Sequence, residues 1–359
     1  MSNSYKYSSL KIVNFPEKIQ SFKTGQITAP IYVRVKPTNI CNHDCYWCAY
    51  KESWSGMHEL SPDRETDYKG TVAQLSRDKL LEVLEDFRDM GVRAVTYSGG
   101  GEPLAHKNIV EVMQQTLIYG IDLSIITNGQ LLFGDRAHAL AGAKWVRISM
   151  DYFDGPSIKA SRGTAESAYD TIMKNIENFS QIKHPNCDLG VNFVITKDNY
   201  HQIENITEKL CLVGVDNIRF SPVYTKDFVQ YHEAIAKDVI FRIDAAKKLY
   251  DAPGFRVYSS YDFDTQKLTR GYTKCLFMQV VPVVAADGGV YACHNKAYDT
   301  TGLIGSIADR RFRELWFSNE AKAVFEGLNP QHDCNHQCAA DSKNIALNSI
   351  VESAGDNFV

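Results

Sequence analysis

The sequence lacks several features that define common protein classes. No apolar run reaches the roughly 18 residues of a membrane-spanning helix, and the N-terminus lacks the charged, apolar and small-residue succession of a signal peptide. There is no basic excess either, because 39 Lys and Arg stand against 43 Asp and Glu. Charge therefore gives no argument for nucleic-acid binding. We expect a cytoplasmic protein that binds neither a membrane nor nucleic acid.

Cysteine is the residue that the sequence has in unusual number. Nine cysteines occur in 359 residues, and seven of them lie in two groups. In a reducing compartment, grouped thiols favour metal binding over disulfide formation. Cys187 and Cys211 stand alone, and we expect them to pack within the protein. The grouped cysteines are Cys41, Cys45 and Cys48 near the N-terminus and Cys275, Cys293, Cys334 and Cys338 in the last third.

The first group forms a C-x3-C-x2-C run within residues 39–50, a few residues after a predicted strand at 31–35. Three thiolates so close together can bind three irons of a cubane 4Fe-4S cluster and leave the fourth iron without a protein ligand. That open iron is available to a cofactor or substrate. A zinc or other structural thiol site is the alternative for the same cysteines.

Amphipathic helices alternate with short apolar strands between residues 75 and 222. This alternation predicts an α/β fold, an open and partial (β/α)6 TIM-like barrel whose chemistry gathers at the carboxyl ends of the strands. Ser76 is the expected N-cap of the first helix and Gly91 its end. The predicted helices are 75–90, 108–119, 135–141, 165–179 and 201–213, and the predicted strands are 31–35, 94–98, 123–127, 145–150, 189–195 and 217–222.

The chain divides into four predicted segments. The first is an N-terminal lead-in that covers the bottom of the barrel, and the third is a helical connector. Residues 50–70, within the barrel segment, are rich in turn formers and too many for a simple connection, so we expect them near the mouth of the site. The segments are 1–30 (lead-in), 31–225 (barrel), 226–270 (connector) and 271–359 (a small domain with a β-hairpin and a helix).

Chemically useful side chains follow the second and fourth predicted strands. Gly100 and Gly101 allow close approach of the backbone to a ligand, and Glu102 can accept a hydrogen bond from an ammonium group. Asp151 can bind ribose hydroxyls, and Arg162 can pair with a carboxylate. Together these groups suit an amino acid joined to a nucleoside.

Other polar side chains at strand ends have two readings. Asn128, after the third strand, is either a site residue or only a turn residue. Arg219 and Tyr224, at the end of the sixth strand, face the expected mouth and could contact a substrate, but packing explains them equally well. The sequence singles out no side chain as the general base or the hydrogen donor.

Two motifs make the sequence resemble the radical S-adenosylmethionine (radical SAM) superfamily over residues 31–225. The cysteine run has the family's C-x3-C-x-aromatic-C form, with Trp47 as its aromatic residue. Residues 100–103 match the family's GGEP motif at the expected strand end. The resemblance implies that the open iron binds the amino and carboxylate groups of S-adenosylmethionine (SAM).

The resemblance also implies roles for the candidate residues. Glu102 and its neighbouring glycines would hold the amino group of SAM, Ser149 and Asp151 would hold its ribose or carboxylate, and Trp47 would line the adenine pocket. Reduction of the cluster, with a flavodoxin or ferredoxin as the expected reductase, would cleave SAM to a 5'-deoxyadenosyl radical. That radical would abstract a hydrogen atom from the substrate.

The second cysteine group begins with a C-x12-G-x4-C pattern formed by Cys275, Gly288 and Cys293. A hairpin is predicted here, with arms at 279–285 and 290–294 and a turn at 287–289. The last two cysteines follow a helix-like stretch at 312–325. Four thiolates from these segments can fully ligate one 4Fe-4S cluster. Structural zinc is the alternative, and the nearby histidines His294, His332 and His336 are alternative ligands.

This tail resembles the auxiliary-cluster domains called SPASM and twitch. A full SPASM domain holds two extra clusters and needs more cysteines than this tail has, so the resemblance favours the twitch form with one cluster. The spacing from Cys334 to Cys338 is C-x3-C, which departs from the C-x2-C of the twitch dehydrogenase of aminocyclitol antibiotic synthesis. The departure argues against close orthology with that enzyme.

The second cluster decides which function we predict. A closed cluster can accept the electron that a substrate radical gives up, so we predict an oxidoreductase that dehydrogenates a sugar or cyclitol type of small molecule. The first alternative is crosslinking or epimerisation of a ribosomal peptide, and the second is a redox-neutral sugar epimerisation or elimination. A non-catalytic iron-sulfur electron carrier is the alternative outside enzymes.

Overall fold

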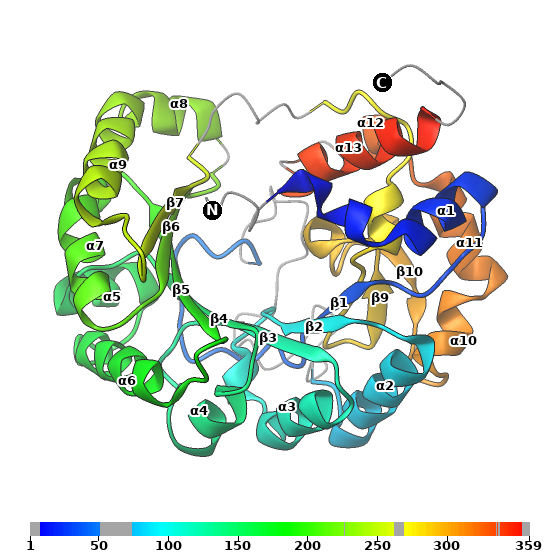
Figure 1. Cartoon of the computed structure of the whole chain (residues 1–359), viewed down its shortest axis with the longest axis horizontal. Coiled ribbons are helices and arrows are strands. Elements are labelled where there is room, and N and C mark those ends of the chain that lie inside the picture. The colour runs from blue at the N-terminus through cyan, green and yellow to red at the C-terminus, as the bar shows by residue number, and fades with distance from the viewer. Residues whose placement is uncertain are drawn as a thin grey trace.

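The computed structural model describes residues 8–50, 74–225, 227–261, 269–334, 336 and 338–353. One curved ten-stranded sheet runs through it, and its two ends do not meet, so the barrel is open (Figure 1). Within the described residues, no helix combines the length and the apolar character that crossing a membrane requires. The strands lie in the order β10 (Leu303–Ser306), β9 (Gly289–Tyr291), β8 (Val283–Val284), β1 (Tyr32–Val35), β2 (Ala94–Tyr97), β3 (Asp122–Thr127), β4 (Trp145–Met150), β5 (Asp188–Ile195), β6 (Asn217–Pro222) and β7 (Arg256–Ser259).

Strands β1 to β7 are parallel, and helices cover their outer face (Figure 1). The six predicted strands are confirmed with their ends shifted by at most one residue, but β7 lies in the connector that we predicted to be helical. The helices of this region are α2 (Arg77–Met90), α3 (Ile109–Ile118), α4 (Gly134–Leu140), α5 (Gly155–Arg162), α6 (Ala168–Ile182), α7 (Ile203–Leu212), α8 (Phe228–Glu233) and α9 (Ala236–Tyr250).

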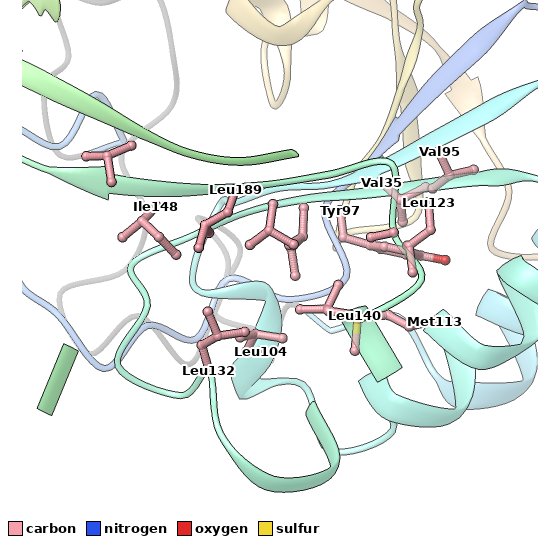
Figure 2. Close-up of a cluster of buried hydrophobic side chains, with 14 of the residues drawn as sticks. Val35, Val95, Tyr97, Leu104, Met113, Leu123, Leu132, Leu140, Ile148 and Leu189 are labelled. Carbon is pink, nitrogen blue, oxygen red and sulfur yellow. The ribbon is translucent and has the colours of Figure 1, made fainter. Parts of the chain in front are cut away.

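The core lies between the sheet and the outer helices. In β4, Val146, Ile148 and Met150 are fully buried, whereas Arg147 and Ser149 on the opposite face are partly exposed. Because successive strand residues point to opposite faces, the apolar set fixes which side receives the helices. Figure 2 shows side chains from the strands packing together with those of the outer layer, and it labels Val35, Val95, Tyr97, Leu104, Met113, Leu123, Leu132, Leu140, Ile148 and Leu189.

The ends of α2 were predicted correctly because both capping residues are local signals. The side chain of Ser76 accepts a hydrogen bond from the amide of Lys79, and Gly91 adopts the left-handed backbone with φ 79°. The sequence prediction missed α5. Its signal was present in the capping box formed by Asp154 and Ser157, with Pro156 in the first turn.

The C-terminal elements extend the same sheet. Strand β8 pairs in parallel with β1, and β9 and β10 follow as antiparallel strands. The predicted hairpin is confirmed, with shorter arms than expected, and Gly288 takes φ 78° in its turn. The predicted helical stretch at 312–325 is divided at Ser318, which caps the second helix. The helices of the tail are α10 (Phe312–Trp316), α11 (Asn319–Gly327), α12 (Pro330–Asp333) and α13 (Asp341–Glu352).

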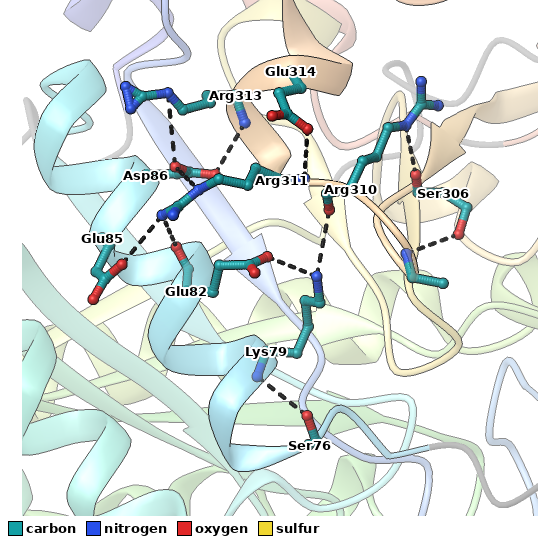
Figure 3. A network of polar contacts seen from close by, with 11 residues as sticks. Ser76, Lys79, Glu82, Glu85, Asp86, Ser306, Arg310, Arg311, Arg313 and Glu314 are labelled. Atoms are coloured by element: carbon teal, nitrogen blue, oxygen red, sulfur yellow. Dashed lines mark hydrogen bonds and ion pairs between the residues drawn. The ribbon is translucent and has the colours of Figure 1, made fainter.

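A polar network fastens this tail to α2 (Figure 3). The carboxylate of Asp86 has no exposed surface, and it accepts hydrogen bonds from Arg311 Nε at 2.8 Å and from the amide of Arg313 at 3.1 Å. Arg311 also reaches Glu85 at 3.2 Å, and Lys79 donates to the carbonyl of Arg310 at 3.3 Å. These contacts hold the start of α10 against the barrel.

The N-terminal segment packs on the tail. Ile12, in the 3-10 helix η2 (Ser9–Asn14), shares an apolar cluster with Val280 and with Leu347 of α13. Helix α1 (Pro16–Thr24) follows beside α13 (Figure 1). We had expected this lead-in to cover the bottom of the barrel. Ile12, Ile19 and Phe22 pack in the cluster with the C-terminal elements, and Ile27 packs on the main core.

Candidate active site

The loop with the first three cysteines follows β1 and is held by the turn that follows β2. The amide of Gly101 donates to the carbonyl of Thr38 at 3.0 Å, and the amide of Glu102 donates to that of Ile40 at 2.8 Å. A Cβ atom on Gly101 would lie 2.0 Å from the Ile40 carbonyl oxygen. Glycine is therefore required here for close backbone approach, as the sequence predicted.

The turn after β3 holds the same loop. Asn128 Nδ2 donates to Asn42 Oδ1 at 2.8 Å, and Gln130 Oε1 lies 2.7 Å from His43 Nε2. Burial lowers the pKa of His43 to about 4, and the charge of Arg162 acts in the same direction. The side chain of Asn128 thus positions the cysteine loop, whichever role it has toward a ligand.

The end of α5 supports the loop from another side. The amides of Asp44 and Tyr46 donate to the carbonyls of Arg162 and Ser161, at 2.7 and 3.1 Å. Gly163 takes φ 60°, and a Cβ atom there would lie 3.0 Å from Cβ of Asp44. Helix α5, which the sequence prediction missed, therefore packs against the cysteine loop and supports it.

Arg162 is buried at the centre of this arrangement. Its Nε lies 2.6 Å from Asp151 Oδ1, and its Nη1 donates to the sulfur of Cys45 at 3.4 Å. Its guanidinium lies 5.0 Å from the ring centre of Trp47, whose indole N–H donates to the other oxygen of Asp151. Burial raises the pKa of the Cys45 thiol, and Arg162 opposes this by stabilising the thiolate.

Arg162 Nη2 also donates to the carbonyl of Ser149 at 3.1 Å. The structure therefore brings together four of the predicted SAM contacts, namely Trp47, Ser149, Asp151 and Arg162. Both oxygens of Asp151 already accept protein hydrogen bonds. An ionised carboxylate has further lone pairs, so a ribose contact by Asp151 stays a prediction.

Glu102 is buried between the turn that follows β2 and the turn that follows β3. Its carboxylate accepts hydrogen bonds from the hydroxyl of Thr127 at 2.6 Å, from the amide of Asn128 at 2.7 Å and from the amide of Leu104 at 3.0 Å. Burial raises its pKa, and these donors oppose the rise by stabilising the ionised form. The carboxylate thus ties the end of β2 to the end of β3, and its predicted contact with the amino group of SAM is untested.

A row of polar side chains crosses the inner face of the sheet. The sequence analysis did not predict that these side chains lie together. Ser149 pairs with Asn192, Asn192 with Arg219, and Arg219 with Tyr258, on four adjacent strands from β4 to β7. All four are on the face opposite the buried apolar residues. The signal was the alternation of polar and apolar residues in each strand. Tyr224 lies beyond this row and stacks on Phe228.

The four tail cysteines also lie near one another. Burial raises the pKa of Cys334 to about 12, and the charges of Cys293 and Cys338 add to the rise. Burial likewise raises the pKa of Cys275, with further contributions from Cys293, Cys338 and Cys334. Mutual effects of this kind require four thiols within electrostatic reach of one another, as ligands of one cluster would be.

Backbone amides near two of the tail sulfurs favour their ionised form. Cys293 stands at the N-cap position of the 3-10 helix η7 (His294–Lys296), where burial raises the pKa of its thiol and the amides of Lys296 and Asn295 oppose the rise. Cys275 similarly precedes η6 (Leu276–Gln279), and the amide of Met278 opposes the rise of its pKa on burial. Amide donors stabilise thiolates, which are the form that binds iron. Both sets of cysteines therefore fit thiolate ligation.

The other predicted ligands and lone cysteines have clear positions. His332 is exposed, and His336 lies between Cys334 and Cys338 in the sequence. Burial lowers the pKa of His294 well below its usual value, and the charges of Lys36 and Arg34 act in the same direction. Among the described residues, no three acidic, histidine or cysteine side chains converge on a single ion. A cubane does not need such convergence, because each thiolate binds a different iron. Cys187 is buried in the core and Cys211 packs against it, as predicted.

Two family models match this chain. The model of the radical SAM superfamily matches residues 35–210, and the model of the SPASM iron-sulfur cluster-binding domain matches residues 275–340. The chain belongs to the radical SAM superfamily. Its cofactors are SAM and a 4Fe-4S cluster, with further iron-sulfur ligation in the SPASM domain. These parts of the sequence prediction are confirmed, while the residues that bind each group stay predictions.

Curated relatives match this radical SAM chain over most of its length. It is 24% identical over 305 residues to the tungsten-containing aldehyde ferredoxin oxidoreductase cofactor-modifying protein of Pyrococcus furiosus, which covers 80% of this chain and 81% of the relative. It is 23% identical over 317 residues to the PqqA peptide cyclase of Bradyrhizobium diazoefficiens, covering 83% of this chain and 76% of the relative.

The fold is also similar to that of a solved structure. SuiB of Streptococcus suis, bound to its precursor peptide SuiA, superposes with a TM-score of 0.62 at 14% identity, covering 87% of this chain and 70% of that chain. At this identity the likeness shows the fold alone. The predicted open α/β barrel with a small C-terminal domain is confirmed.

Proposed function

We propose that this radical SAM enzyme modifies a peptide, with the barrel cysteines holding the SAM-binding cluster and the tail cysteines holding one auxiliary cluster. The first set is Cys41, Cys45 and Cys48, and the second is Cys275, Cys293, Cys334 and Cys338. The observation that carries the proposal is the pairing of both domains in one sheet, in a chain that aligns with a peptide cyclase through both domains.

When bound, the reduced cluster supplies one electron that cleaves SAM to methionine and a 5'-deoxyadenosyl radical, which takes a hydrogen atom from the substrate. The chain's own residues orient the reactants. Arg162 and Asp151 hold Trp47 of the cysteine loop in place, where its ring would line the proposed adenine position. The proposed binding site of the methionine amino group consists of the Gly100–Gly101 backbone and Glu102.

The row Ser149, Asn192, Arg219 and Tyr258 offers polar contacts to a substrate on the inner face of the sheet. An auxiliary cluster held by the four tail cysteines would supply an acceptor for one electron, so that a substrate which had lost a hydrogen atom and then a proton would be oxidised by two electrons in total. Our first prediction was a sugar or cyclitol substrate for this same oxidation. The peptide substrate, which was the alternative, has the support of the relatives.

The test uses the anaerobic, cluster-loaded enzyme with SAM and a reductant such as reduced flavodoxin. The probes are peptides encoded beside the gene, with a panel of sugars and cyclitols in parallel. We expect a peptide to stimulate 5'-deoxyadenosine formation and to lose two hydrogen atoms or gain a deuterium from solvent. Oxidation of a sugar with no response to peptide would overturn the peptide substrate, and absence of any 5'-deoxyadenosine would support an electron carrier.

A further inference from the structure

Lys36 stands where the barrel meets the auxiliary domain. It directly follows β1, and its amide donates to the carbonyl of Val284 in β8 at 2.8 Å. Its side chain is completely buried. The ammonium nitrogen lies 4.3 Å from the ring centre of Tyr50 and 5.4 Å from that of Tyr298. One tyrosine follows the first cysteine group, and the other belongs to the matched SPASM segment.

The ammonium of Lys36 has no hydrogen-bond acceptor among the described residues. In the part of the chain that the structure describes, two other lysines are buried, and both have hydrogen-bond acceptors. Lys18 donates to the carbonyls of Thr28 and Ala29 at 3.1 and 3.0 Å. Lys296 donates to Thr301 at 2.6 Å and lies 3.5 Å from Asp299. A buried cation that faces only aromatic rings calls for an anion nearby, because removal from water is unfavourable without one.

The acidic groups that act on Lys36 are Asp287 and one cysteine of each group. Burial and the charge of Arg34 lower the pKa of Lys36 well below its usual value, whereas Cys48, Asp287 and Cys293 act in the opposite direction. Cys48 belongs to the first cysteine group and Cys293 to the second. Cys48 also packs on the apolar cluster that contains Tyr50 and Tyr298. Tyr291, two residues before Cys293, belongs to the same cluster, so the aromatic cluster that Lys36 contacts adjoins both cysteine groups. The negative charge of bound clusters would favour the protonated form of Lys36 and oppose the effect of burial.

Tyr298 is held in this place against its backbone preference. Its φ is 70°, and among the described residues it is the only one other than glycine with positive φ. Its hydroxyl donates to Asn39 Oδ1 at 2.5 Å, two residues before Cys41. A bulky residue in the left-handed region is strained, and such strain persists where surrounding contacts fix it, commonly at functional sites.

We propose that Lys36 is the cation shared by the two iron-sulfur clusters, that its charge raises the reduction potential of both, and that Tyr50 and Tyr298 hold it between them. A positive charge favours the more negative, reduced form of a cluster. Lys36 thus acts on electron transfer through its charge, without contacting the substrate. The proposal rests on the proposed cluster ligands, and it does not depend on the substrate.

The experiment is a redox titration of the cluster-loaded protein, without substrate, followed by electron paramagnetic resonance. The cluster with the open iron is recognised because its signal changes when SAM is added. Lys36→Met keeps the length of the side chain and removes its charge. We expect the ratio of reduced to oxidised cluster at a fixed potential to fall about tenfold for both clusters, which is about 59 mV for one electron.

Two further variants separate charge from structure. Lys18→Met removes a buried lysine that interacts with neither cysteine group, and it should leave both potentials unchanged. Lys36→Arg keeps the charge and should retain potentials near those of the wild type. If Lys36→Met binds less than about eight irons per chain, Lys36→Gln, which keeps hydrogen-bond donors, replaces it in the titration.

An unchanged potential for either cluster, with full iron content, would overturn the proposal, since one ammonium would then not serve both. Failure of the peptide substrate would appear instead in the turnover assay, with these potentials unaffected. Failure of the cluster assignment would appear as an iron content of the wild type well below two clusters. The three outcomes are therefore distinguishable.

Discussion

The guanidinium of Arg162 donates a hydrogen bond to the sulfur of Cys45 across 3.4 Å. The same side chain is paired with Asp151, and both are almost fully buried. A neighbouring cation and hydrogen-bond donor stabilises a thiolate, so this contact would favour the ionised form of Cys45 that the proposed iron ligation needs. The contact joins the cysteine loop, which the motif predicts, to helix α5, which the motif does not predict.

Replacement of Arg162 should therefore destabilise both the fold and the first cluster. In Arg162→Met the charge of Asp151 stays buried without its cation, which typically lowers the free energy of unfolding by about 3–5 kcal/mol. Anaerobic urea denaturation and iron analysis measure the two effects. Arg242→Met removes a partly exposed pair with Glu204 and should change stability by about 1 kcal/mol or less. Equal effects of the two substitutions would contradict the assigned role.

The cysteine groups should lose iron independently. Cys275→Ala is expected to remove about four of about eight irons and to preserve reductive cleavage of SAM, because the first group is intact. Cys45→Ala should abolish that cleavage. Iron analysis and chromatographic measurement of 5'-deoxyadenosine report the two results. Cys187→Ala, at a buried position in the core, is the matched control and should retain both clusters. Zinc instead of iron in the tail would refute the auxiliary cluster.

A single methyl group at position 100 should disturb the site. A Cβ atom there would lie 1.9 Å from Asn39 Oδ1 and 2.9 Å from the hydroxyl of Tyr298. Gly100→Ala must therefore displace the cysteine loop, and overpacking of this kind destabilises by about 1–3 kcal/mol. We expect the dissociation constant for SAM, measured by calorimetry, to rise about tenfold or more. Gly271→Ala has nothing within 4 Å of the new atom and should behave as the wild type.

The docking of the tail on α2 should depend on Asp86 (Figure 3). Asp86→Ala leaves Arg311 and the amide of Arg313 without their buried acceptor, which should lower the free energy of unfolding by about 2–3 kcal/mol. Hydrogen exchange should increase first in α10. Glu85→Ala removes an exposed partner of the same arginine, and a loss as large as that of Asp86→Ala would contradict the importance of burial.

His106 should make stability depend on pH. Its Nε2 lies 2.8 Å from the carbonyl of Leu75, and its Nδ1 accepts from the amide of Asn108 at 3.3 Å, so the neutral ring is bound. Burial lowers its pKa below 6.5 in the folded state. The unfolded chain then binds the proton more readily, so stability is present above about pH 6.5 and decreases as the pH falls below it. His106→Gln should flatten this dependence in urea denaturation measured at several pH values.

Local patterns determined much of the fold. The alternation in Trp145–Met150 predicted β4, and the paired signals Ser76 and Gly91 predicted α2, because strand period and helix caps depend on residues close in sequence. The cysteine spacing and the GGEP residues likewise predicted the family and its cofactors. Helix α5 was missed although Asp154 and Ser157 signalled it, since the short apolar pattern of the helix is weak.

What the sequence by itself determined is the chemistry: two groups of thiolates, a glycine-rich turn and the strands that carry them. Only the tertiary structure decided that β8 joins β1, that Arg162 reaches Cys45, and that Lys36 contacts the rings of Tyr50 and Tyr298. Arg162 and Cys45 are 117 positions apart in the sequence, and the residues that pair β1 with β8 are further apart. No local pattern records them, because long-range pairing is fixed by the packing of the whole sheet.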